Sequence, residues 1–519
     1  MAGIYGLSGS GMDVDALVKS LMTVQRASNA GLTQKQTVLQ WKKEAYNKVY
    51  DDISNFRNSV FNYKLQGTLN PKVVSSSNTS VATATALGDA ANVTHSLVVS
   101  QLADGVKLTS SGSISTGSSG NINSQIDNTL NAPFTFTIAN GTASKSITID
   151  PSTETMNDLV SKINSSGTNI QASYDTTLDR FFLSTTNTGA TTGIRFSSLS
   201  SDTNANKFIS DLKLGGLGAA QPDVPIVGTT TYASAPGKDA EFTLDGTDLT
   251  KSSNVFTIAS VSYHLTGTTG TQPATSIGVT NDVDKAVASI KSLVESYNTI
   301  LTAMNGKTSE ARYAAYAPLT ADQKTSMKEE EITAWNIKAK SGMLYNDTTL
   351  NSLVNKMRNA FSNPISGLTG QYTSASAIGI TTGNYTEKGK LYLDETKLRT
   401  ALTNDPNVLN AIFATPGTNI VNTTTIDPNT QGIAARLYDV LKTTMDTLST
   451  QAGTTSTASS DTSSYLAKQI KTFTNRITQA TARETKMEAA YYKQFNTMET
   501  ALAKLNTQSN WLFQQMGSS

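Results

Sequence analysis

The sequence predicts an α+β multidomain protein, with terminal coiled-coil-like helical arms, a helical bundle-like domain and two inserted β-rich modules. One observation is the distribution of proline, since all 12 prolines lie between Pro71 and Pro428. Because proline costs about 3 kcal/mol in a helix interior, both proline-free ends permit long helices. Another is a change of pattern between Lys72 and about Thr280, where turn residues separate short stretches of alternating apolar residues. Together they predict an assembly subunit and not an enzyme with a pocket.

The N-terminal arm is predicted to begin at Asp13, a suitable N-cap, before apolar residues at helical spacing. Gly31 is expected to act as a hinge or weak point. A second series then steps by seven from Leu32 to Val60, which is typical of a coiled-coil stripe. A continuous helix from Asp13 to Leu65 would be about 80 Å long. For Leu32 to Tyr63 we favour burial inside the same chain.

The C-terminal arm carries a matching stripe, and no glycine lies between Gly453 and Gly517. An ordinary helical hairpin buried in one domain is the alternative. However, a lone pair of long helices buries only a narrow stripe, worth about 1.5–3 kcal/mol per well-buried apolar side chain. Ordering the chain costs a similar amount per residue. We therefore expect partner subunits to cover the remainder. The predicted assembly contacts are Val14, Leu17, Leu21, Val24, Tyr491, Phe495, Met498, Leu502, Leu505, Trp511 and Leu512.

Between the arms, the alternation around Asn140-Gly141 predicts a hairpin. A helix over Thr155–Ile163 and two further strands would complete a ββαββ unit. Asp245-Gly246 predicts another hairpin turn, and Gly215 to Pro236 is interpreted as a linker between modules. Helices are then expected from Val283 onward, over Lys328–Lys340, Leu350–Phe361, Asp394–Leu402 and Ile433–Leu448. The helix over Lys328–Lys340 opens with Glu329-Glu330-Glu331, and acidic residues in a first turn suit the helix dipole. We therefore interpret this run as capping.

The composition excludes several classes of function. With 519 residues, roughly three or four domains are expected. A net charge of +1 provides no basic field for nucleic acid or anionic membrane. Without cysteine there are no disulfides, thiolate metal sites or Cys nucleophiles. No run of 18 apolar residues occurs, so we expect no membrane insertion, and the N-terminal residues lack the pattern of a cleavable secretory signal.

A search for catalytic chemistry is mostly negative. The two histidines, His95 and His264, lie in strand-like surroundings and do not predict a metal site. There is no nucleophile elbow, no phosphate-binding glycine loop and no EF-hand calcium loop. We expect no enzymatic activity, no cofactor and no metal.

Motifs spread over nearly the whole chain resemble those of the flagellar filament-capping (FliD, or hook-associated protein 2) family. The N-terminal motifs run from Gly9 to Val18 and from Val98 to Ala103, followed by Asp239 to Gly246 with Ser252-Ser253-Asn254. The helical region adds Pro318-Leu319-Thr320, Trp335, Lys338 to Leu344, Ala377 to Ile380, Gly389-Lys390-Leu391 and Leu393-Asp394-Glu395. The C-terminal motifs are Tyr492 to Phe495 and Leu505 to Ser509. The segment around Ile163-Asn164 is similar to a small β-rich repeat of flagellins. The loop from Gln451 to Ser464 departs from the family pattern.

The resemblance implies a structural protein that is secreted through the flagellar type III export apparatus to the distal filament tip. It implies a homo-oligomeric cap, usually a pentamer, which helps incoming flagellin fold and insert. The implied partners are further copies of the chain, flagellin, the hook-filament junction protein and an export chaperone. The implied domains are a leg (1–42 and 475–519), a helical domain (43–75 and 280–474), an outer β-rich domain (76–120 and 237–279) and an inserted β-rich domain (121–236).

Three alternatives remain at this stage. The polar β modules also suit a secreted adhesin or glycan-binding role, which binding by an isolated 76–279 fragment would reveal. Flagellin itself or a junction protein would show different terminal signatures. An exported hydrolase is disfavoured because two histidines and no cysteine offer few catalytic groups.

Overall fold

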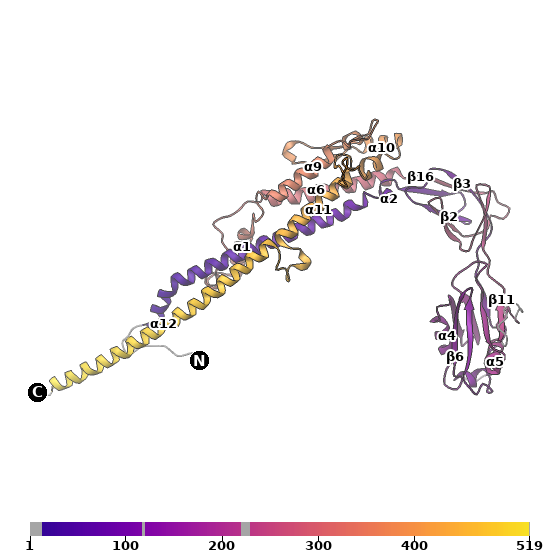
Figure 1. Ribbon diagram of the computed structural model, residues 1–519, viewed down its shortest axis with the longest axis horizontal. Helices are drawn as coiled ribbons and strands as arrows, with labels where there is room; N and C mark the ends of the chain where they lie inside the picture. The colour runs from indigo at the N-terminus through magenta and orange to yellow at the C-terminus, as the bar shows by residue number, and fades with distance from the viewer. Residues whose placement is uncertain (1–12, 117–119, 220–228, 518–519) are drawn as a thin grey trace. The chain divides into compact units, whose positions relative to one another are not determined.

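The computed structural model describes residues 13–116, 120–219 and 229–517, and the chain forms two compact units (Figure 1). A helical unit is built from both ends of the chain, up to Leu69 and from Val283 onward. A β-rich unit comprises Asn70–Asp282. The predicted α+β multidomain class, with helical ends and β-rich material between them, is confirmed. The finer division into four domains stays a prediction.

The helical unit consists mainly of long helices, with two short strands. Its α-helices are α1 (Val14–Asn62), α2 (Gln66–Leu69), α6 (Val283–Ser309), α7 (Ala321–Thr325), α8 (Glu329–Lys340), α9 (Thr348–Ser362), α10 (Glu395–Asn404), α11 (Ile433–Ala452) and α12 (Tyr465–Met516). Its shorter elements are η1 (Ala375–Ile378), β17 (Ile380–Thr382), η2 (Tyr385–Glu387), β18 (Leu391–Leu393), η3 (Asn410–Ala414) and η4 (Thr455–Thr457).

Helix α1 begins where the sequence predicts, because the Asp13 carboxylate accepts a hydrogen bond of 2.8 Å from the Ala16 backbone N–H. The expectation of a hinge at Gly31 is wrong, since α1 continues through this residue without a break. A glycine inside a helix costs roughly 0.5–1 kcal/mol relative to alanine. Contacts with α12 on either side of Gly31, through Asn29 and Gln36, offset that cost.

The main core of the helical unit lies around the second half of α1. Tyr46, Val49, Ile53, Phe56 and Val60 are buried together with apolar residues of α6, α9 and α11. At about 1.5–3 kcal/mol per fully buried side chain, this face fixes α1 in the bundle. The interpretation of this stretch as intramolecular core is therefore confirmed from Tyr46 to Tyr63, whereas Leu32 is only half-buried.

The helices expected after Val283 are confirmed with small differences at their ends. The acidic run Glu329, Glu330 and Glu331 forms the first turn of α8, as the dipole argument requires. Asp394 is the N-cap of α10, where its carboxylate accepts from the Lys397 N–H at 3.0 Å. Thus local capping chemistry sets these helix starts.

The β-rich unit contains sixteen strands and three short helices in its described residues. Its strands are β1 (Lys72–Ser76), β2 (Ala82–Ala86), β3 (Thr94–Gln101), β4 (Lys107–Thr109), β5 (Phe134–Asn140), β6 (Ala143–Ile149), β7 (Ile170–Asp175), β8 (Arg180–Thr185), β9 (Arg195–Leu199), β10 (Leu217–Ala219), β11 (Thr229–Ser234), β12 (Ala240–Leu244), β13 (Thr247–Lys251), β14 (Val255–Ile258), β15 (Val261–Leu265) and β16 (Thr275–Asn281). Its helices are α3 (Ile122–Ile126), α4 (Met156–Asn164) and α5 (Thr203–Asp211).

These strands form four antiparallel sheets around two separate cores. One core joins the sheets β1-β16-β3-β12-β13 and β14-β15-β2, and includes Phe242 and Tyr263. The other joins the sheets β10-β11-β9-β5-β6 and β4-β8-β7, and includes Phe136, Phe196 and Phe208. In each core, every second residue along a strand points inward, which agrees with the alternating apolar pattern of the sequence.

Both predicted hairpins are confirmed, since Asn140 pairs with Ala143 and Leu244 pairs with Thr247. The four strands of the predicted ββαββ unit exist, but they belong to two sheets and not to one. The interpretation of Gly215 to Pro236 as a linker is wrong in its described part. There, β10 and β11 extend the sheet of β9 by hydrogen bonding, so tertiary pairing overrides the turn-rich composition.

Candidate assembly surface

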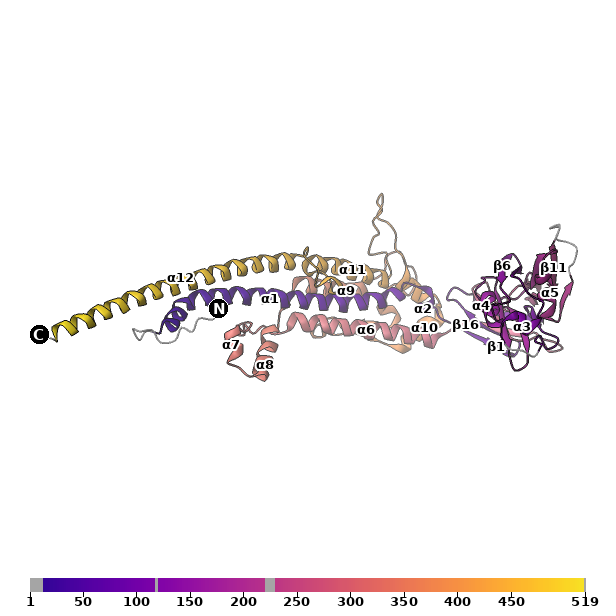
Figure 2. The same cartoon turned by 90° about the horizontal axis from the view of Figure 1, so that it is seen from below.

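The two predicted arms pair with each other as antiparallel helices. Arg26 of α1 bonds Glu484 at 3.2 Å and Glu488 at 2.8 Å, both on α12. Asn29 also donates to Glu484, and the Gln36 amide donates to the Thr474 hydroxyl at 2.7 Å. Figures 1 and 2 both show α12 running alongside α1. Polar contacts therefore fix the register of this helix pair.

The pairing continues to the beginning of α1. The Tyr492 phenol of α12 forms a hydrogen bond with Asp15 in the first turn of α1, and this contact raises the pKa of Tyr492. From Tyr492, α12 continues for 516 − 492 = 24 residues, a rise of about 36 Å. Figure 1 shows this end of α12 continuing past the start of α1.

The predicted assembly residues of α1 lie on its outer side. Val18 and Met22 are fully buried, and they share a face with Asn29, which contacts α12. By contrast, Leu17, Leu21 and Val24 are exposed, Val24 to 80%, and Val14 is half-buried. The apolar stripe of this arm thus has two rows, one for α12 and one facing outward. The predicted contacts on α1 contain only the outward row, because sequence spacing could not tell which row α12 covers.

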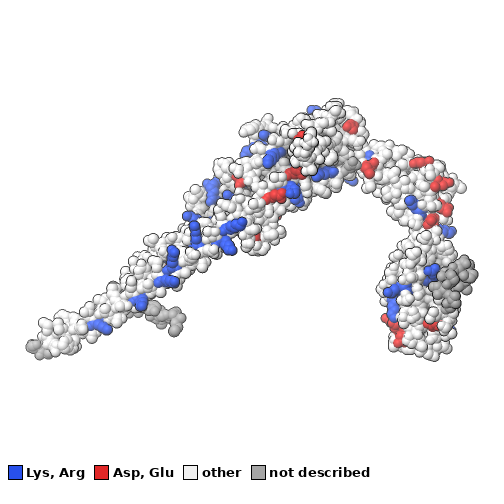
Figure 3. Space-filling view, in the orientation of Figure 1, with Lys and Arg blue, Asp and Glu red and all other residues white. Residues whose placement is uncertain are grey.

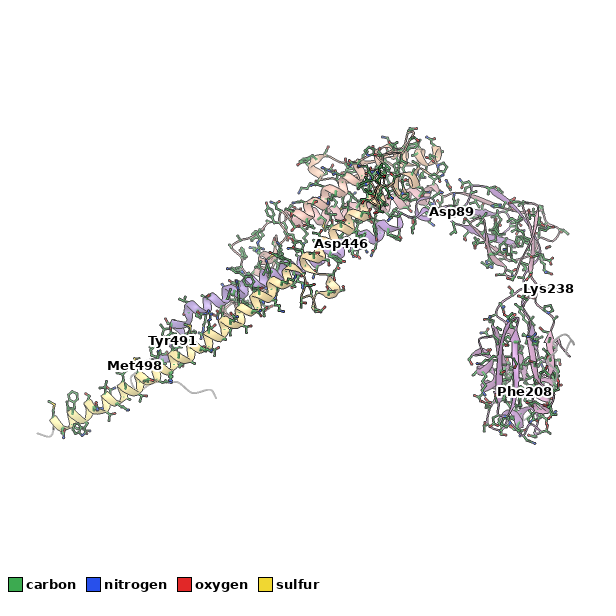
Figure 4. All side chains as sticks on the ribbon, in the orientation of Figure 1. Asp89, Phe208, Lys238, Asp446, Tyr491 and Met498 are labelled. Atoms are coloured by element: carbon green, nitrogen blue, oxygen red, sulfur yellow. The ribbon has the colours of Figure 1, made fainter. Side chains whose placement is uncertain are left out.

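On α12 the predicted residues other than Trp511 follow a heptad seam that begins at Tyr491, reaches Leu512 and continues to Met516. Its members alternate steps of four and three, namely Tyr491, Phe495, Met498, Leu502, Leu505, Ser509, Leu512 and Met516. Tyr491, Phe495 and Leu502 are half-buried, whereas Met498, Leu505, Trp511 and Leu512 are exposed. Figure 4 labels Tyr491 next to α1 and Met498 further toward the C-terminal end of α12.

Two further apolar residues belong to this surface. Phe513 and Met516 are 75% and 71% exposed on the last turns of α12. The prediction did not include them, although Met516 continues the heptad spacing that would have found it. Isolated exposed apolar residues are normal on a protein surface, but several along one helix face indicate an interaction site. Here they are Met498, Leu505, Leu512 and Met516. Figure 3 shows Lys and Arg side chains spaced singly along this arm, without a continuous charged field.

The segment that departs from the family pattern anchors the base of α12. Lys43 of α1 forms an ion pair of 2.8 Å with Asp461, and the two side chains are only 11% and 3% exposed. Asp461 also accepts from the backbone N–H groups of Ser463 and Ser464 and from the Ser464 hydroxyl, at 3.1, 3.0 and 2.6 Å. Thr455 adds a hydrogen bond of 2.7 Å to Asp51. The loop between α11 and α12 is therefore tied to α1.

The described residues give little support for catalysis. The His95 Nδ1–H donates to the Asp245 carboxylate at 2.6 Å, in the turn after β12, and His264 lies exposed on β15. In the described ranges, no group of three or more His, Cys, Asp or Glu side chains could hold a metal ion. Nor does any described helix combine the length and the apolar character that crossing a membrane requires.

Family models match most of the chain. The model described as the flagellar hook-associated protein 2 C-terminus matches residues 237–507, and its N-terminal counterpart matches residues 10–105. The model described as the flagellin hook IN motif matches residues 134–187, which cover the hairpin β5-β6, α4 and the hairpin β7-β8.

Relatives and one solved structure agree with these matches. The chain is 29% identical to a flagellar hook-associated protein 2 of Halalkalibacterium halodurans over 96% of this chain and 97% of that protein. It is 27% identical to the protein of that name from Escherichia coli K12, over 99% and 98% of the two chains. The crystal structure of the flagellar cap protein FliD D1-D2-D3 domains from Escherichia coli has a similar fold, with a TM-score of 0.52 at 19% identity. The match between the two structures covers 83% of this chain and 99% of the Escherichia coli chain.

Paired terminal helices with exposed apolar residues, together with a β-rich insertion, define a structural class of protein. The chain belongs to the flagellar hook-associated protein 2 family.

Proposed function

We infer that this chain is a structural cap at the distal end of the bacterial flagellar filament, where it promotes folding and insertion of exported flagellin. Membership of the flagellar hook-associated protein 2 family supports this function. The observation that carries the mechanism is the exposed seam on α12, from Met498 to Met516, together with the outward row of α1.

The proposed mechanism is reversible burial. Apolar residues that are exposed in one chain gain about 25 cal/mol for each Å² removed from water when another helix covers them. A heptad seam accepts any helix that presents matching apolar residues, so neighbouring subunits and the terminal helices of flagellin can cover it in turn. Exchange between these partners would let the cap remain attached while a new subunit enters.

The cap is a secreted homo-oligomer at the filament tip, and we propose five subunits. We propose flagellin, the hook-filament junction protein and an export chaperone as its further partners. Within the chain, residues 1–42 and 475–519 would form the leg, 43–75 and 280–474 the helical domain, 76–120 and 237–279 the outer β-rich domain, and 121–236 the inserted domain. We propose no enzymatic activity, and the family assignment does not favour an adhesin role.

The test distinguishes a loss of seam burial from a loss of folding. Leu505→Asp with Leu512→Asp places two charges on the seam, and Thr500→Asp places one on the opposite, exposed side of the same helix as a control. We expect each purified variant to keep the helical content of the wild type. In a strain lacking the native gene, the seam variant should not support filament growth, whereas the control should. Normal filaments from the seam variant would refute the mechanism.

A further inference from the structure

The β-rich unit contains a joint where the chain passes between its two cores. We call the two sheets around Tyr263 the Tyr263 module and the two sheets around Phe208 the Phe208 module. Two segments cross between them, 102–106 from β3 to β4 and 235–239 from β11 to β12.

The two crossing segments pair with each other at one position. Asp104 and Lys238 exchange two backbone hydrogen bonds of 2.9 Å. Figure 4 labels Lys238 at this crossing and Phe208 within its module. Two paired chain segments are marginally stable by themselves, and a few residues between rigid elements are what a hinge requires. This crossing alone would therefore bend.

Each end of the first crossing segment is fixed to the module next to it. At Ala103, the Asn254 side chain of the Tyr263 module accepts from the backbone N–H at 2.7 Å and donates to the carbonyl at 2.8 Å. At Val106, the backbone N–H donates to the hydroxyl of Thr185 in the Phe208 module at 3.0 Å. The Val106 carbonyl also accepts from the Thr185 N–H at 2.9 Å. Bending is thus confined to the residues between these two anchors.

A third segment lies against the crossing. We call residues 187–192, between β8 and β9 of the Phe208 module, the strap. The Gly189 N–H of the strap donates to the Asp104 carbonyl at 3.1 Å. The Thr192 carbonyl of the strap accepts from the Gly237 N–H at 3.0 Å. The strap therefore forms hydrogen bonds with both crossing segments.

The strap also reaches the edge of the Tyr263 module. The Thr188 hydroxyl donates to the Ser252 carbonyl at 2.6 Å, just after β13. The Ala190 N–H donates to the Asp239 carboxylate at 2.7 Å, just before β12. Because the strap belongs to one module and bonds the other, movement at the joint would break both hydrogen bonds.

Glycines allow the strap to approach this closely. A Cβ on Gly189 would lie 2.6 Å from the Ser252 Cβ, and one on Gly237 would lie 2.5 Å from the Asp104 carbonyl oxygen. Real Cβ atoms do not come so near to other atoms, so the backbone of the joint is in direct contact. Close-packed contacts of this kind resist displacement.

The alternative is an ordinary mobile surface loop. The strap has the small polar residues that are typical of loops. A mobile loop, however, forms few contacts with the rest of the fold. Here Thr188, Gly189, Ala190 and Thr192 each form a hydrogen bond across the joint, three of them through their own backbone. These contacts favour a lock over a mobile loop.

We propose that the strap locks the Phe208 module onto the Tyr263 module, so that the two move as one rigid body, and that releasing the strap turns the crossing into a hinge. The proposal goes beyond the proposed function, because it concerns a single chain and holds whatever that chain assembles with. In a cap, such a lock would keep the β-rich unit in one shape while the arms exchange partners.

Distances between spin labels test the lock, because the chain contains no native cysteine. The labels are attached to Thr85→Cys on β2 and Ser144→Cys on β6, which are exposed positions in the two modules of the full-length protein. The release variant adds Thr188→Val and Asp239→Ala, which remove the two hydrogen bonds at the edge of the Tyr263 module.

A matched control removes the same chemical groups within single modules. Thr186→Val removes a hydroxyl that donates to Asn169 inside the Phe208 module. Asp248→Ala removes a carboxylate that accepts from Thr243 inside the Tyr263 module. The control variant carries both substitutions and the same two labels.

We expect one narrow distribution of distances between the labels in the wild type and in the control. The distribution in the release variant should be at least about twice as wide, because a freed crossing permits hinge motion. A broad distribution in the wild type would overturn the lock. An unchanged width in the release variant would overturn the role of the strap.

Hydrogen exchange of backbone amides gives a result that needs no variant. In the wild type, the Gly189 and Ala190 amides should exchange at least about tenfold more slowly than in the urea-unfolded chain, because both are hydrogen-bonded across the joint. In the release variant their exchange should become faster, while the amides of β5 stay protected. If β5 lost its protection, the variant would be unfolded and the wild-type amides would decide. Exchange of Gly189 and Ala190 in the wild type at the rate of the unfolded chain would overturn the proposal.

Discussion

Replacing Lys43 with methionine tests whether the loop before α12 is truly tied to α1. The substitution removes the cation from a pair whose side chains are 11% and 3% exposed. Removal of one partner of a buried ion pair typically costs about 3–5 kcal/mol, because the remaining charge stays buried without compensation. Here Asp461 keeps four hydrogen bonds from Ser463 and Ser464. We therefore expect a loss near the lower end, about 3 kcal/mol in the free energy of unfolding of the helical unit.

Urea unfolding followed by far-UV circular dichroism measures this loss. The matched control is Lys48→Met, on an exposed position of the same helix, which should change the free energy of unfolding by less than about 0.5 kcal/mol. A double variant, Lys43→Met with Asp461→Leu, should recover part of the loss because no buried charge remains. If Lys43→Met behaved like the control, the account of a buried anchor would be wrong.

The same pair predicts a dependence on pH. Burial by itself raises the pKa of the Asp461 carboxyl, but hydrogen bonds from Lys43 and Ser464 outweigh burial and hold the pKa below its ordinary value of 3.8. The folded-state pKa is thus depressed, so the contribution of Asp461 is present above about pH 4 and is lost as the pH falls below it. In Asp461→Asn this part of the acid sensitivity should disappear, whereas an unchanged acid profile would contradict the assignment.

Three further predictions concern other contacts. Arg436→Lys should destabilise the helical unit by on the order of 3 kcal/mol in urea unfolding. The guanidinium donates to four backbone carbonyls in one plane, and an ammonium cannot replace all four hydrogen bonds. An unchanged free energy of unfolding would contradict the role of Arg436 in joining the end of α9 to the segment before α11. Arg26→Met should cost about 1 kcal/mol or less, since its partners Glu484 and Glu488 are partly exposed, and its effect should shrink in high salt. Gly189→Ala should destabilise the β-rich unit by at least about 1 kcal/mol in thermal unfolding, because φ is 107° and a Cβ would lie 2.6 Å from the Ser252 Cβ.

Much of the architecture could be predicted from local patterns. Proline-free apolar periodicity predicts α1 and α12, and capping residues such as Asp13 and Asp394 predict where helices begin. Turn chemistry at Asn140-Gly141 and Asp245-Gly246 predicts the two hairpins. These features depend on interactions within a few residues, so a single sequence is sufficient to find them.

Features that depend on distant contacts could not be predicted in this way. Gly31 stays helical because α12 packs beside it, and Leu217–Ala219 is a strand because β11 is available to pair with it. Likewise, the spacing of the first arm could not separate buried Val18 and Met22 from exposed Leu17 and Leu21. That distinction depends on where α12 lies. Val421 is 83% exposed in the short hairpin that the Asn419–Ile426 bridge closes before α11, and no helical or strand period in the sequence predicts this exposure.

Hydrogen exchange of backbone amides in 498–516 tests the central claim most directly. This part of α12 extends past the start of α1, and most of its described side chains are exposed. A helix without tertiary packing opens readily, so its amides should exchange quickly in the isolated chain. In the assembled cap, burial of the seam should slow exchange of these amides by at least about tenfold. Equally slow exchange in the monomer, or no change on assembly, would contradict the account.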